Sequence, residues 1–253
     1  MSPLPPSIVE LVDELMAMSG VVAVVLGGSR AVGVSDGDSD WDLGVYYRGR
    51  LDLGRLEARG AVYPPGSWGR LMNGGAWLRC NGLRVDVLLR DLDTVEQWAR
   101  RAEQGEFEID ALLGYVAGAP TYLVSAELAS CRPVRGEVPA APFTPKLMSA
   151  APPKWRWCRS FSLDYARMHA RRGNHVGTVA QAAKAVLEEA HAVMCERGQW
   201  VCNEKRLIEA ANLSAVQPIF ARVPPESGQL LRWLDQVAAR LQAPKDEAAP
   251  WNV

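Results

Sequence analysis

The sequence has no long apolar run, no excess of charge of either sign and no paired cysteines. None of its apolar stretches reaches the roughly 18 residues expected of a membrane-spanning helix, and the opening Met-Ser-Pro-Leu-Pro-Pro has neither the basic nor the apolar part of a secretory leader. The five cysteines are odd in number and show no CxxC or Cys/His spacing, so neither a disulfide framework nor a zinc site is indicated. We therefore expect a cytoplasmic protein without a membrane partner.

Charge is balanced over the whole chain, with 28 basic and 29 acidic residues and a net charge of -1. This balance gives no general reason to expect nucleic acid as a partner. Residues 1–145 are net acidic and residues 146–253 are net basic, however, so the second half is the better suited to a polyanionic ligand. With 253 residues and 48% hydrophobic content, the chain can bury the core of one large domain or of two smaller ones.

The N-terminal part has the pattern of an α/β (α+β) domain with a mixed sheet. Residues 7–18 place apolar side chains at helical spacing and end at Gly20, which predicts a helix. The β-branched run 21–26 predicts a buried strand, and residues 40–47 predict a second strand after a loop rich in Gly, Ser and Asp.

A β-hairpin is predicted farther along the chain. Asn81-Gly82 separates the apolar segments 76–80 and 83–89, and this residue pair suits a turn that needs positive φ at both positions. Asp91 is placed to cap a helix that runs to about residue 102.

Prolines mark the expected domain boundary. Residues 132–153 contain six of them among small residues, the composition of a linker or an irregular arm. We therefore predict an α/β domain over residues 1–135, a linker over 136–153 and an α-helical domain over 154–253. Helices are predicted in this last part at 154–172, 175–198, 203–212 and 227–241.

The segment after the first strand has the composition of an anion-binding loop. Gly27 and Gly28 let backbone N–H groups approach an anion closely, and Ser29 adds a hydroxyl donor. A helix that starts at this point would also direct the positive end of its dipole at a phosphate. Taken alone, a Gly-Gly-Ser sequence at a strand end is more often an ordinary turn.

Two aspartates on the next predicted strand make the nucleotide interpretation the stronger one. Asp40 and Asp42 lie two residues apart, so both carboxylates point to one face of the sheet. Their repulsion is about 4 kcal/mol at a separation of about 4 Å and an effective dielectric of about 20. Protonation of one acid or a bound divalent cation would relieve this repulsion, and a nearby phosphate site favours Mg²⁺.

Asp86 is the third acid and the only charge in residues 85–89. A sheet that places this strand beside residues 40–47 would bring Asp86 to the same metal ions. Two-metal chemistry needs carboxylates around ions that are about 3.5–4 Å apart. The alternative for Asp86 is an edge-strand charge that faces water.

A Gly-Gly-Ser sequence, a spacer, Asp-x-Asp on a strand and a later lone strand aspartate resemble the nucleotidyltransferase superfamily, which includes DNA polymerase beta and the aminoglycoside nucleotidyltransferases. The match covers about residues 20–90, and the helical second half is similar only in its general plan. The resemblance implies a two-domain enzyme that uses Mg²⁺, as two ions, and ATP or another nucleoside triphosphate as donor. It implies catalytic and metal-binding roles for Asp40, Asp42 and Asp86, and contacts to the nucleotide for Gly27, Gly28 and Ser29.

Further candidates flank this motif or lie in the helical half. Arg30 is expected to pair either with the nucleotide phosphates or with the acidic loop that follows it. In similar two-domain enzymes a lysine of the helical domain reaches the phosphates and an acid acts as base. Lys184 is therefore a candidate for phosphate binding, and Glu188 or Glu189 competes with Asp86 as the base. An ion pair within the helix is the alternative for Lys184 and Glu188.

Basic side chains gather along the predicted helix 154–172, with Trp155 and Trp157 among them. A solvated basic face is one interpretation of this pattern. The other is a surface that grips a triphosphate or a nucleic-acid backbone, for which arginine forks and aromatic stacking are suited.

The sequence thus predicts a Mg²⁺-dependent nucleotidyltransferase that moves a nucleoside monophosphate, most simply AMP from ATP, onto a hydroxyl of a small-molecule acceptor such as an antibiotic, with release of pyrophosphate. One alternative is a toxin-type transferase that modifies tRNA or a partner protein; the basic helix suits RNA, whereas the near-neutral total charge does not. Another is a non-catalytic nucleotide-binding or antitoxin module. The acceptor, the preferred nucleotide and the oligomeric state are left open.

Overall fold

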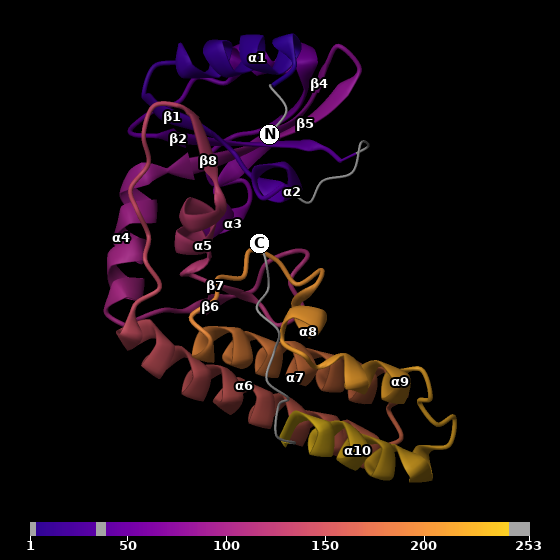
Figure 1. Cartoon of the computed structure of the whole chain (residues 1–253). Helices are drawn as coiled ribbons and strands as arrows, with labels where there is room; N and C mark the ends of the chain where they lie inside the picture. The colour runs from indigo at the N-terminus through magenta and orange to yellow at the C-terminus, as the bar shows by residue number, and fades with distance from the viewer. Residues whose placement is uncertain (1–3, 34–38, 243–253) are drawn as a thin grey trace. The chain divides into compact units, whose positions relative to one another are not determined.

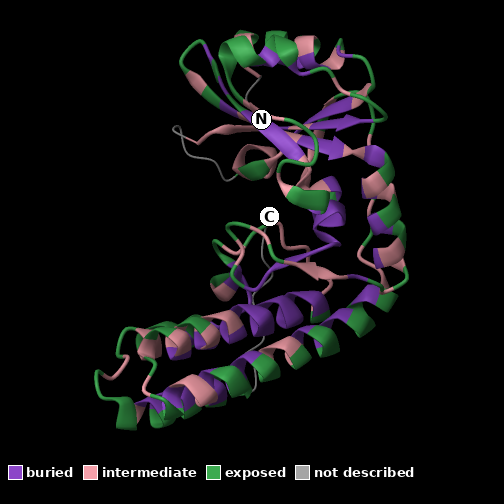
Figure 2. Ribbon diagram, turned by 180° about the vertical axis from the view of Figure 1, so that it is seen from behind, coloured by how far each residue is buried: buried purple, intermediate pink, exposed green. Residues whose placement is uncertain are grey.

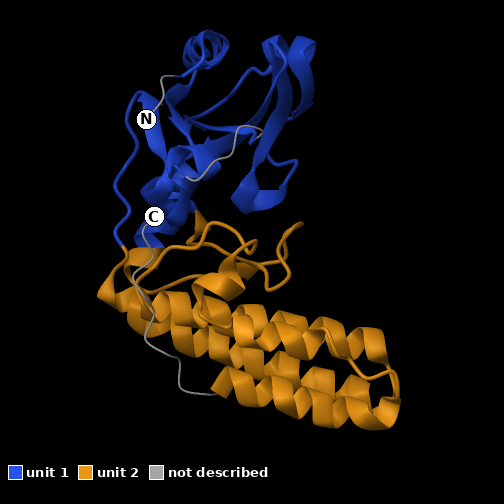
Figure 3. Ribbon diagram, turned by 45° about the vertical axis from the view of Figure 1, so that its right-hand side comes forward, with its two compact units in different colours: residues 1–101, 124–142, 253 blue, residues 102–123, 143–252 orange. Residues whose placement is uncertain are grey.

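The computed structural model describes residues 4–33 and 39–242 (Figure 1). Two compact units divide the chain, and each of them is built from two separate pieces of it (Figure 3). Among the described residues, the first unit comprises residues 4–33, 39–101 and 124–142, and the second comprises residues 102–123 and 143–242. The predicted boundaries therefore differ from the observed ones, because residues 102–123 pack with the helical unit.

A six-stranded mixed sheet forms the first unit, in the strand order β3-β4-β5-β2-β1-β8. The strands are β1 (Val21–Leu26), β2 (Trp41–Tyr47), β3 (Gly60–Tyr63), β4 (Gly74–Cys80), β5 (Leu83–Asp91) and β8 (Arg132–Arg135). β2 and β5 run parallel, whereas the other neighbouring pairs are antiparallel. The predicted mixed sheet is thus confirmed, and its parallel pair consists of the two strands that carry Asp42 and Asp86.

Helix α1 (Pro6–Met16) packs against one face of this sheet (Figure 1). Its apolar residues recur at helical spacing and are fully buried; they are Ile8, Leu11, Val12 and Leu15. They share a core with strand residues that alternate toward the same side, namely Val24, Leu26, Leu43, Val45, Val85, Val87 and Leu89. In Figure 2 the inner strands β1, β2 and β4 are coloured as buried over most of their length, the edge strands β3 and β8 are not, and the outer side of α1 is exposed.

Short helices connect the strands of this unit: α2 (Gly28–Ala31), the 3-10 helix η1 (Gly54–Arg59), α3 (Gly69–Met72), α4 (Leu92–Glu103) and α5 (Leu123–Ser130). Asp91 caps α4 as predicted, because its carboxylate accepts hydrogen bonds from the backbone N–H of Asp93 at 3.0 Å and from the hydroxyl of Thr94 at 3.3 Å.

The predicted hairpin is also confirmed, since Asn81 and Gly82 join β4 to β5 with φ of 48° and 83°.

The sheet face opposite α1 is closed at one end by an ion pair. Arg90 of β5 is only 2% exposed, and its guanidinium donates two hydrogen bonds of 2.6 Å to the carboxylate of Glu127 in α5. It also donates to the carbonyl of Met72 at 2.8 Å. A buried charge needs such partners to offset its lost hydration. This end of the face is therefore structural, and the end that carries Asp42 and Asp86 stays partly exposed.

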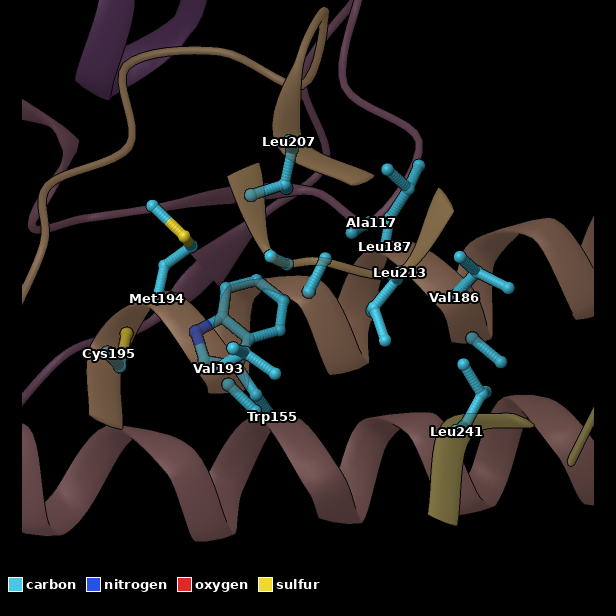
Figure 4. Close-up of a cluster of buried hydrophobic side chains, with 14 of the residues drawn as sticks. Ala117, Trp155, Val186, Leu187, Val193, Met194, Cys195, Leu207, Leu213 and Leu241 are labelled. Atoms are coloured by element: carbon cyan, nitrogen blue, oxygen red, sulfur yellow. The ribbon is translucent and has the colours of Figure 1, made fainter. Parts of the chain in front are cut away.

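The second unit is mainly helical. Its elements are β6 (Ile109–Asp110), β7 (Ala119–Pro120), α6 (Pro145–Arg171), α7 (His175–Glu196), α8 (Leu207–Ala210), η2 (Ser214–Val216), α9 (Gln217–Phe220), η3 (Ser227–Gln229) and α10 (Leu230–Gln242). Figure 4 shows its core around Trp155, with Val193 and Met194 nearby. None of the helices in the described part of the chain has the length and apolarity needed to cross a membrane.

The predicted proline-rich linker is wrong in its second half, because α6 begins at Pro145 and includes Pro152 and Pro153. Thr144 caps this helix by accepting a hydrogen bond from the backbone N–H of Leu147 at 3.3 Å, and Pro145 stands at a first-turn position that needs no N–H partner. A proline in a helix interior costs about 3 kcal/mol. Tertiary packing offsets that cost, since Pro152 is buried in the same helix as Trp155.

The helix predicted over residues 203–212 is also shorter than expected. Only α8 at Leu207–Ala210 forms there, and Asn203 caps a turn before it by accepting from the backbone N–H of Lys205 at 3.0 Å. Trp200 packs on the core, with its ring centroid 4.4 Å from that of Phe143. The predicted helix thus forms over only part of its expected length.

Candidate functional site

The Gly-Gly-Ser segment runs from the end of β1 into α2 and is hydrogen-bonded to β2. The backbone N–H of Gly27 donates to the carbonyl of Asp42 at 2.8 Å. Gly28 adopts a φ of +60°, a conformation that glycine enters without steric cost. Ser29 follows in the first turn of α2, partly exposed. The predicted phosphate loop and the predicted carboxylate strand are therefore parts of one local structure.

Gly28 also makes room for a carboxylate. A Cβ atom added at this residue would lie 1.8 Å from Oδ2 of Asp42, far inside van der Waals contact. The absence of a side chain at Gly28 thus lets the Asp42 carboxylate approach the backbone of the loop closely. This contact joins the anion-binding segment to the acid in space, as the sequence motif predicts.

Asp42 and Asp86 are direct neighbours across the parallel strands β2 and β5, because their Cα atoms are register partners. Adjacent strands lie about 4.8 Å apart, and register partners point to the same face of a sheet. Both residues are half-buried and both lie on the face opposite α1. The structure therefore brings these two predicted acids together.

Asp40 is in a different position. It lies just before β2, and its carboxylate forms an ion pair with the guanidinium of Arg84 at 2.5 Å. Across the described ranges 4–33 and 39–242, no group of three His, Cys, Asp or Glu side chains is close enough to hold a metal ion. Asp42 and Asp86 are therefore brought together by the strand register, whereas Asp40 pairs with Arg84.

The donor set at Asp42 and Asp86 suits one magnesium ion. Mg²⁺ is typically held by one or two carboxylates, and it completes its octahedral coordination with phosphate oxygens and water. Two adjacent carboxylates beside a loop with the composition of a phosphate-binding loop match this requirement. The ion pair with Arg84 engages Oδ1 of Asp40. The second ion that the resemblance implies stays a prediction.

Arg30 holds the chain that leads into β2. Its guanidinium donates to the carbonyl of Ser39 at 2.6 Å and to that of Asp40 at 3.2 Å, and it lies 4.2 Å from the ring centroid of Trp41. These contacts fix the end of the loop that precedes the acids. Residues 34–38 of that loop lie outside the described residues. The proposed contact of Arg30 with phosphate stays a prediction.

The predicted contribution of a helix dipole is small here. α2 comprises only four residues, Gly28–Ala31, so few peptide dipoles are aligned with each other. Binding of a phosphate at this loop would therefore depend on the backbone N–H groups and on the hydroxyl of Ser29.

Two features of this site face were not predicted. The first is Arg84, whose partner Asp40 can be identified only from the register of β2 against β5. The other feature is a group of aromatic side chains, Tyr63, Trp68 and Trp77, which come from three separate segments of the chain. The sequence gives no signal for it, because Ala76, Trp77 and Leu78 are all apolar and only the structure shows that Trp77 is exposed between two buried residues.

In the second unit, Lys184 and Glu188 lie one helical turn apart on α7, with Nζ 3.9 Å from the carboxylate. Glu188 is only 2% exposed, and burial raises its pKa to about 7, against the lowering effects of a hydrogen bond to Ser162 and the charge of Lys184. The pairing within the helix accounts for these two residues structurally. Their predicted roles as phosphate ligand and base stay predictions.

Glu189 and two arginines of the basic helix neutralise one another. The carboxylate of Glu189 is 1% exposed and lies 2.6 Å from the guanidinium of Arg159 and 3.3 Å from that of Arg156. Arg156 also pairs with Glu196. This part of the helix predicted at 154–172 therefore has its basic charge matched by acids of α7, which favours a structural role for both arginines.

Comparisons with known proteins add little to this geometry. No protein-family model matches the sequence, and no curated protein matches it. Among solved structures, the chain is similar to a nucleotidyltransferase-like protein from Exiguobacterium sibiricum 255-15, with a TM-score of 0.47 and 12% sequence identity over 93% of this chain and 73% of that chain. The case for any chemistry consequently rests on the residues of the first unit described above.

Proposed function

We propose that this chain is a nucleotidyltransferase that moves AMP from ATP onto the hydroxyl of a small-molecule acceptor. One observation carries the proposal: the carboxylate of Asp42 lies against Gly28 of the glycine loop, and Asp86 is its register partner on the adjacent strand. A site that binds a magnesium nucleotide needs hydrogen-bond donors for the phosphates and carboxylates for the metal ion. An ordinary strand-to-helix turn needs only the glycines.

Each residue of the site has a distinct task in this proposal. Backbone N–H groups of the loop and the hydroxyl of Ser29 bind the β- and γ-phosphates and stabilise the charge that develops on pyrophosphate. Asp42 and Asp86 would hold Mg²⁺, which lowers the pKa of an attacking hydroxyl and offsets charge on the phosphates. Asp86 accepts the proton of that hydroxyl on a carboxylate oxygen. Arg84 keeps Asp40 oriented at the edge of the site.

The test uses labelled ATP, Mg²⁺ and pools of acceptors, namely antibiotics, tRNA and cell protein. The wild-type protein should transfer label to the small-molecule pool and release pyrophosphate, whereas label in tRNA or in cell protein would contradict a small-molecule acceptor. Asp42→Asn and Asp86→Asn should each reduce transfer by about 100-fold or more, because each removes a charge on which the site depends. Asp40→Asn is expected to reduce it as well.

A matched control tests whether the loss of transfer is specific to the carboxylates of the site. Glu57→Gln removes a carboxylate from an exposed position in η1 of the same unit and should leave transfer unchanged. Circular dichroism and thermal unfolding establish that each variant is folded. Full transfer by a folded Asp42→Asn or Asp86→Asn protein would overturn the proposed function.

A further inference from the structure

Three aromatic side chains form a cluster in the first unit. Tyr63 ends β3, Trp68 stands just before α3, and Trp77 lies in β4. The ring centroid of Tyr63 is 4.7 Å from that of Trp77 and 5.2 Å from that of Trp68, and the two tryptophan rings are 5.9 Å apart. These separations are those of packed aromatic rings. The cluster is therefore a preformed structure.

The register of the sheet aligns this cluster with the acids. Trp77 is the register partner of Asp86 across β4 and β5, and Asp86 is the register partner of Asp42 across β5 and β2. The three residues thus form one row on the face opposite α1. Strands are spaced by about 4.8 Å, so the Cα atom of Trp77 is about 10 Å from that of Asp42. A single small molecule can span this distance.

A glycine supports the cluster from below. Gly75 of β4 is the register partner of Tyr63, and a Cβ atom at Gly75 would lie 2.5 Å from the ring of Trp68. The ring of Trp68 consequently rests on the backbone of the sheet. The Trp68 ring packs on the backbone at Gly75 on one side and on the rings of Tyr63 and Trp77 on the other. These contacts fix its orientation.

Trp77 is nevertheless 52% exposed, between the buried residues Ala76 and Leu78. The exposed part of an indole ring is apolar surface that the fold leaves in water at a cost of about 25 cal/mol for each Å². Contact with a flat ring of a ligand would recover that cost and add stacking energy. Because Trp77 lies in the same row as Asp86 and Asp42, this exposed ring is within reach of a ligand bound at the acids.

The direction of attack indicates which reactant binds at the aromatic cluster. The glycine loop joins the acids from the β1 side, and the aromatic cluster lies beyond Asp86 on the β4 side. In an in-line displacement the attacking oxygen enters opposite the leaving pyrophosphate. If the loop holds the pyrophosphate, the acceptor enters from the side of β5 and β4.

We propose that Tyr63, Trp68 and Trp77 form the acceptor subsite and that the acceptor carries a flat ring, such as a nucleobase or another aromatic ring, next to its reactive hydroxyl. This inference rests on the proposed function and narrows its acceptor to a ring-bearing compound. A polycationic aminoglycoside sugar, which has no flat ring, does not fit the subsite. Stacking on such side chains is expected to raise affinity about 10- to 100-fold.

The test measures binding as well as activity. The full chain is first saturated with a non-hydrolysable ATP analogue and Mg²⁺, and then titrated with adenosine, uridine, a phenolic alcohol and an aminoglycoside while tryptophan fluorescence and heat are recorded. At least one flat-ring probe should bind and quench fluorescence, and the aminoglycoside should not. Trp77→Ala should weaken that binding about 10- to 100-fold, whereas Trp77→Phe should keep it within about threefold.

Two controls separate this inference from the proposed function. Trp157 is 67% exposed and stacks on Phe161 at 5.7 Å in the second unit, so Trp157→Ala removes a comparable ring and should change no affinity. Trp77→Ala should leave the affinity for the ATP analogue unchanged. Binding of the analogue without binding of any flat-ring probe, or weaker binding of the analogue itself to Trp77→Ala, would overturn the acceptor subsite alone. Failure of the wild-type protein to bind the analogue would overturn both proposals.

Discussion

Gly28 joins the two parts of the candidate site because a side chain there would occupy the place of the Asp42 carboxylate. The Cβ atom of Gly28→Ala would lie 1.8 Å from Oδ2 of Asp42, at a backbone φ of +60°. We expect this variant to displace the carboxylate and to weaken binding of the ATP analogue with Mg²⁺ by about tenfold or more. The backbone strain should lower the free energy of unfolding by about 1–2 kcal/mol.

Gly33 offers a matched control for this prediction. Its φ is +77°, and a Cβ atom added there meets none of the described residues within 4 Å. Gly33→Ala therefore imposes similar backbone strain without touching the site. Calorimetric titration of both variants measures the comparison, and an equal loss of affinity in the two would contradict the role assigned to Gly28.

Glu188 predicts a pH dependence of stability in the second unit. Burial raises its pKa from 4.5 to about 7, so the folded protein keeps a proton that the unfolded chain has already lost between these pH values. Because the folded state binds more protons there, the contribution of Glu188 to stability falls as pH rises from 4.5 to 7 and is level above that range.

Glu188→Gln removes this dependence. The free energy of unfolding of the variant, minus that of the wild type, should rise with pH across the same window by at most about 3 kcal/mol. Urea unfolding at a series of pH values measures it. The exposed Glu57→Gln variant should show no such trend, and a flat difference for Glu188→Gln would refute the assignment.

At this scale the sequence was informative about some site residues and silent about others. The meeting of Asp42, Asp86 and the glycines could be predicted because a lone charge in an apolar strand and a Gly-Gly pair at a strand end are both visible in the sequence. The pairing of Asp40 with Arg84 could not, since it depends on the register of β2 against β5. For the same reason the row from Asp86 to Trp77 becomes visible only in the folded sheet.

Among the elements, α6 contains a built-in weakness that can be removed. Pro153 is exposed in its interior, and a proline there lacks the N–H that would donate to the carbonyl four residues earlier. Pro153→Ala should raise the free energy of unfolding by about 2 kcal/mol, the gain in the helix less the greater flexibility of the unfolded chain. Thermal and urea unfolding measure this change.

Pro145 is the natural comparison, because it begins the same helix at a position where the N–H has no partner. Pro145→Ala should bring no stabilisation and a slight loss. If Pro153→Ala were no more stable than Pro145→Ala, helical geometry at residue 153 would be contradicted.

The elements that sequence reasoning identified are those with strong local signals. Residues 21–26 and the Asn81-Gly82 hairpin were predicted correctly because a continuous apolar run and a positive-φ turn leave few alternatives. β3 and β8 were missed, since both are four-residue edge strands. Pro133 lies within β8, where an edge position tolerates the missing N–H.

The two units of the molecule are not divided at the proline-rich segment, where the composition of the sequence changes. Phe107 and Tyr122 belong to the core of the helical unit, although they precede β8 of the first unit in the chain. The hydroxyl of Tyr122 accepts a hydrogen bond of 2.8 Å from the indole N–H of Trp155. Composition alone could not show that residues 102–123 belong to the helical unit. The proline-rich segment is a more conspicuous boundary than the points at which the chain passes between the units.

Fragments test this division. Residues 143–253 alone lack both buried rings, each of which is worth several kcal/mol, a loss comparable with the stability of a whole domain. We expect this fragment to lack cooperative thermal unfolding and near-ultraviolet circular dichroism. The fragment 102–253 restores the rings and should show both. Equal behaviour of the two fragments would show that residues 102–123 are dispensable for the helical unit.

The exchange of segments has a consequence for a protein cut by a protease. Leu113 is 97% exposed, and hydrolysis of the chain beside it would leave two polypeptides that each hold part of both units. The N-terminal product would keep Phe107, which packs among the helices of the other product, while the C-terminal product would keep β8, which pairs with β1 of its counterpart. The two products are interlocked by folding alone, so the nicked protein would migrate as one species until a denaturant separates them.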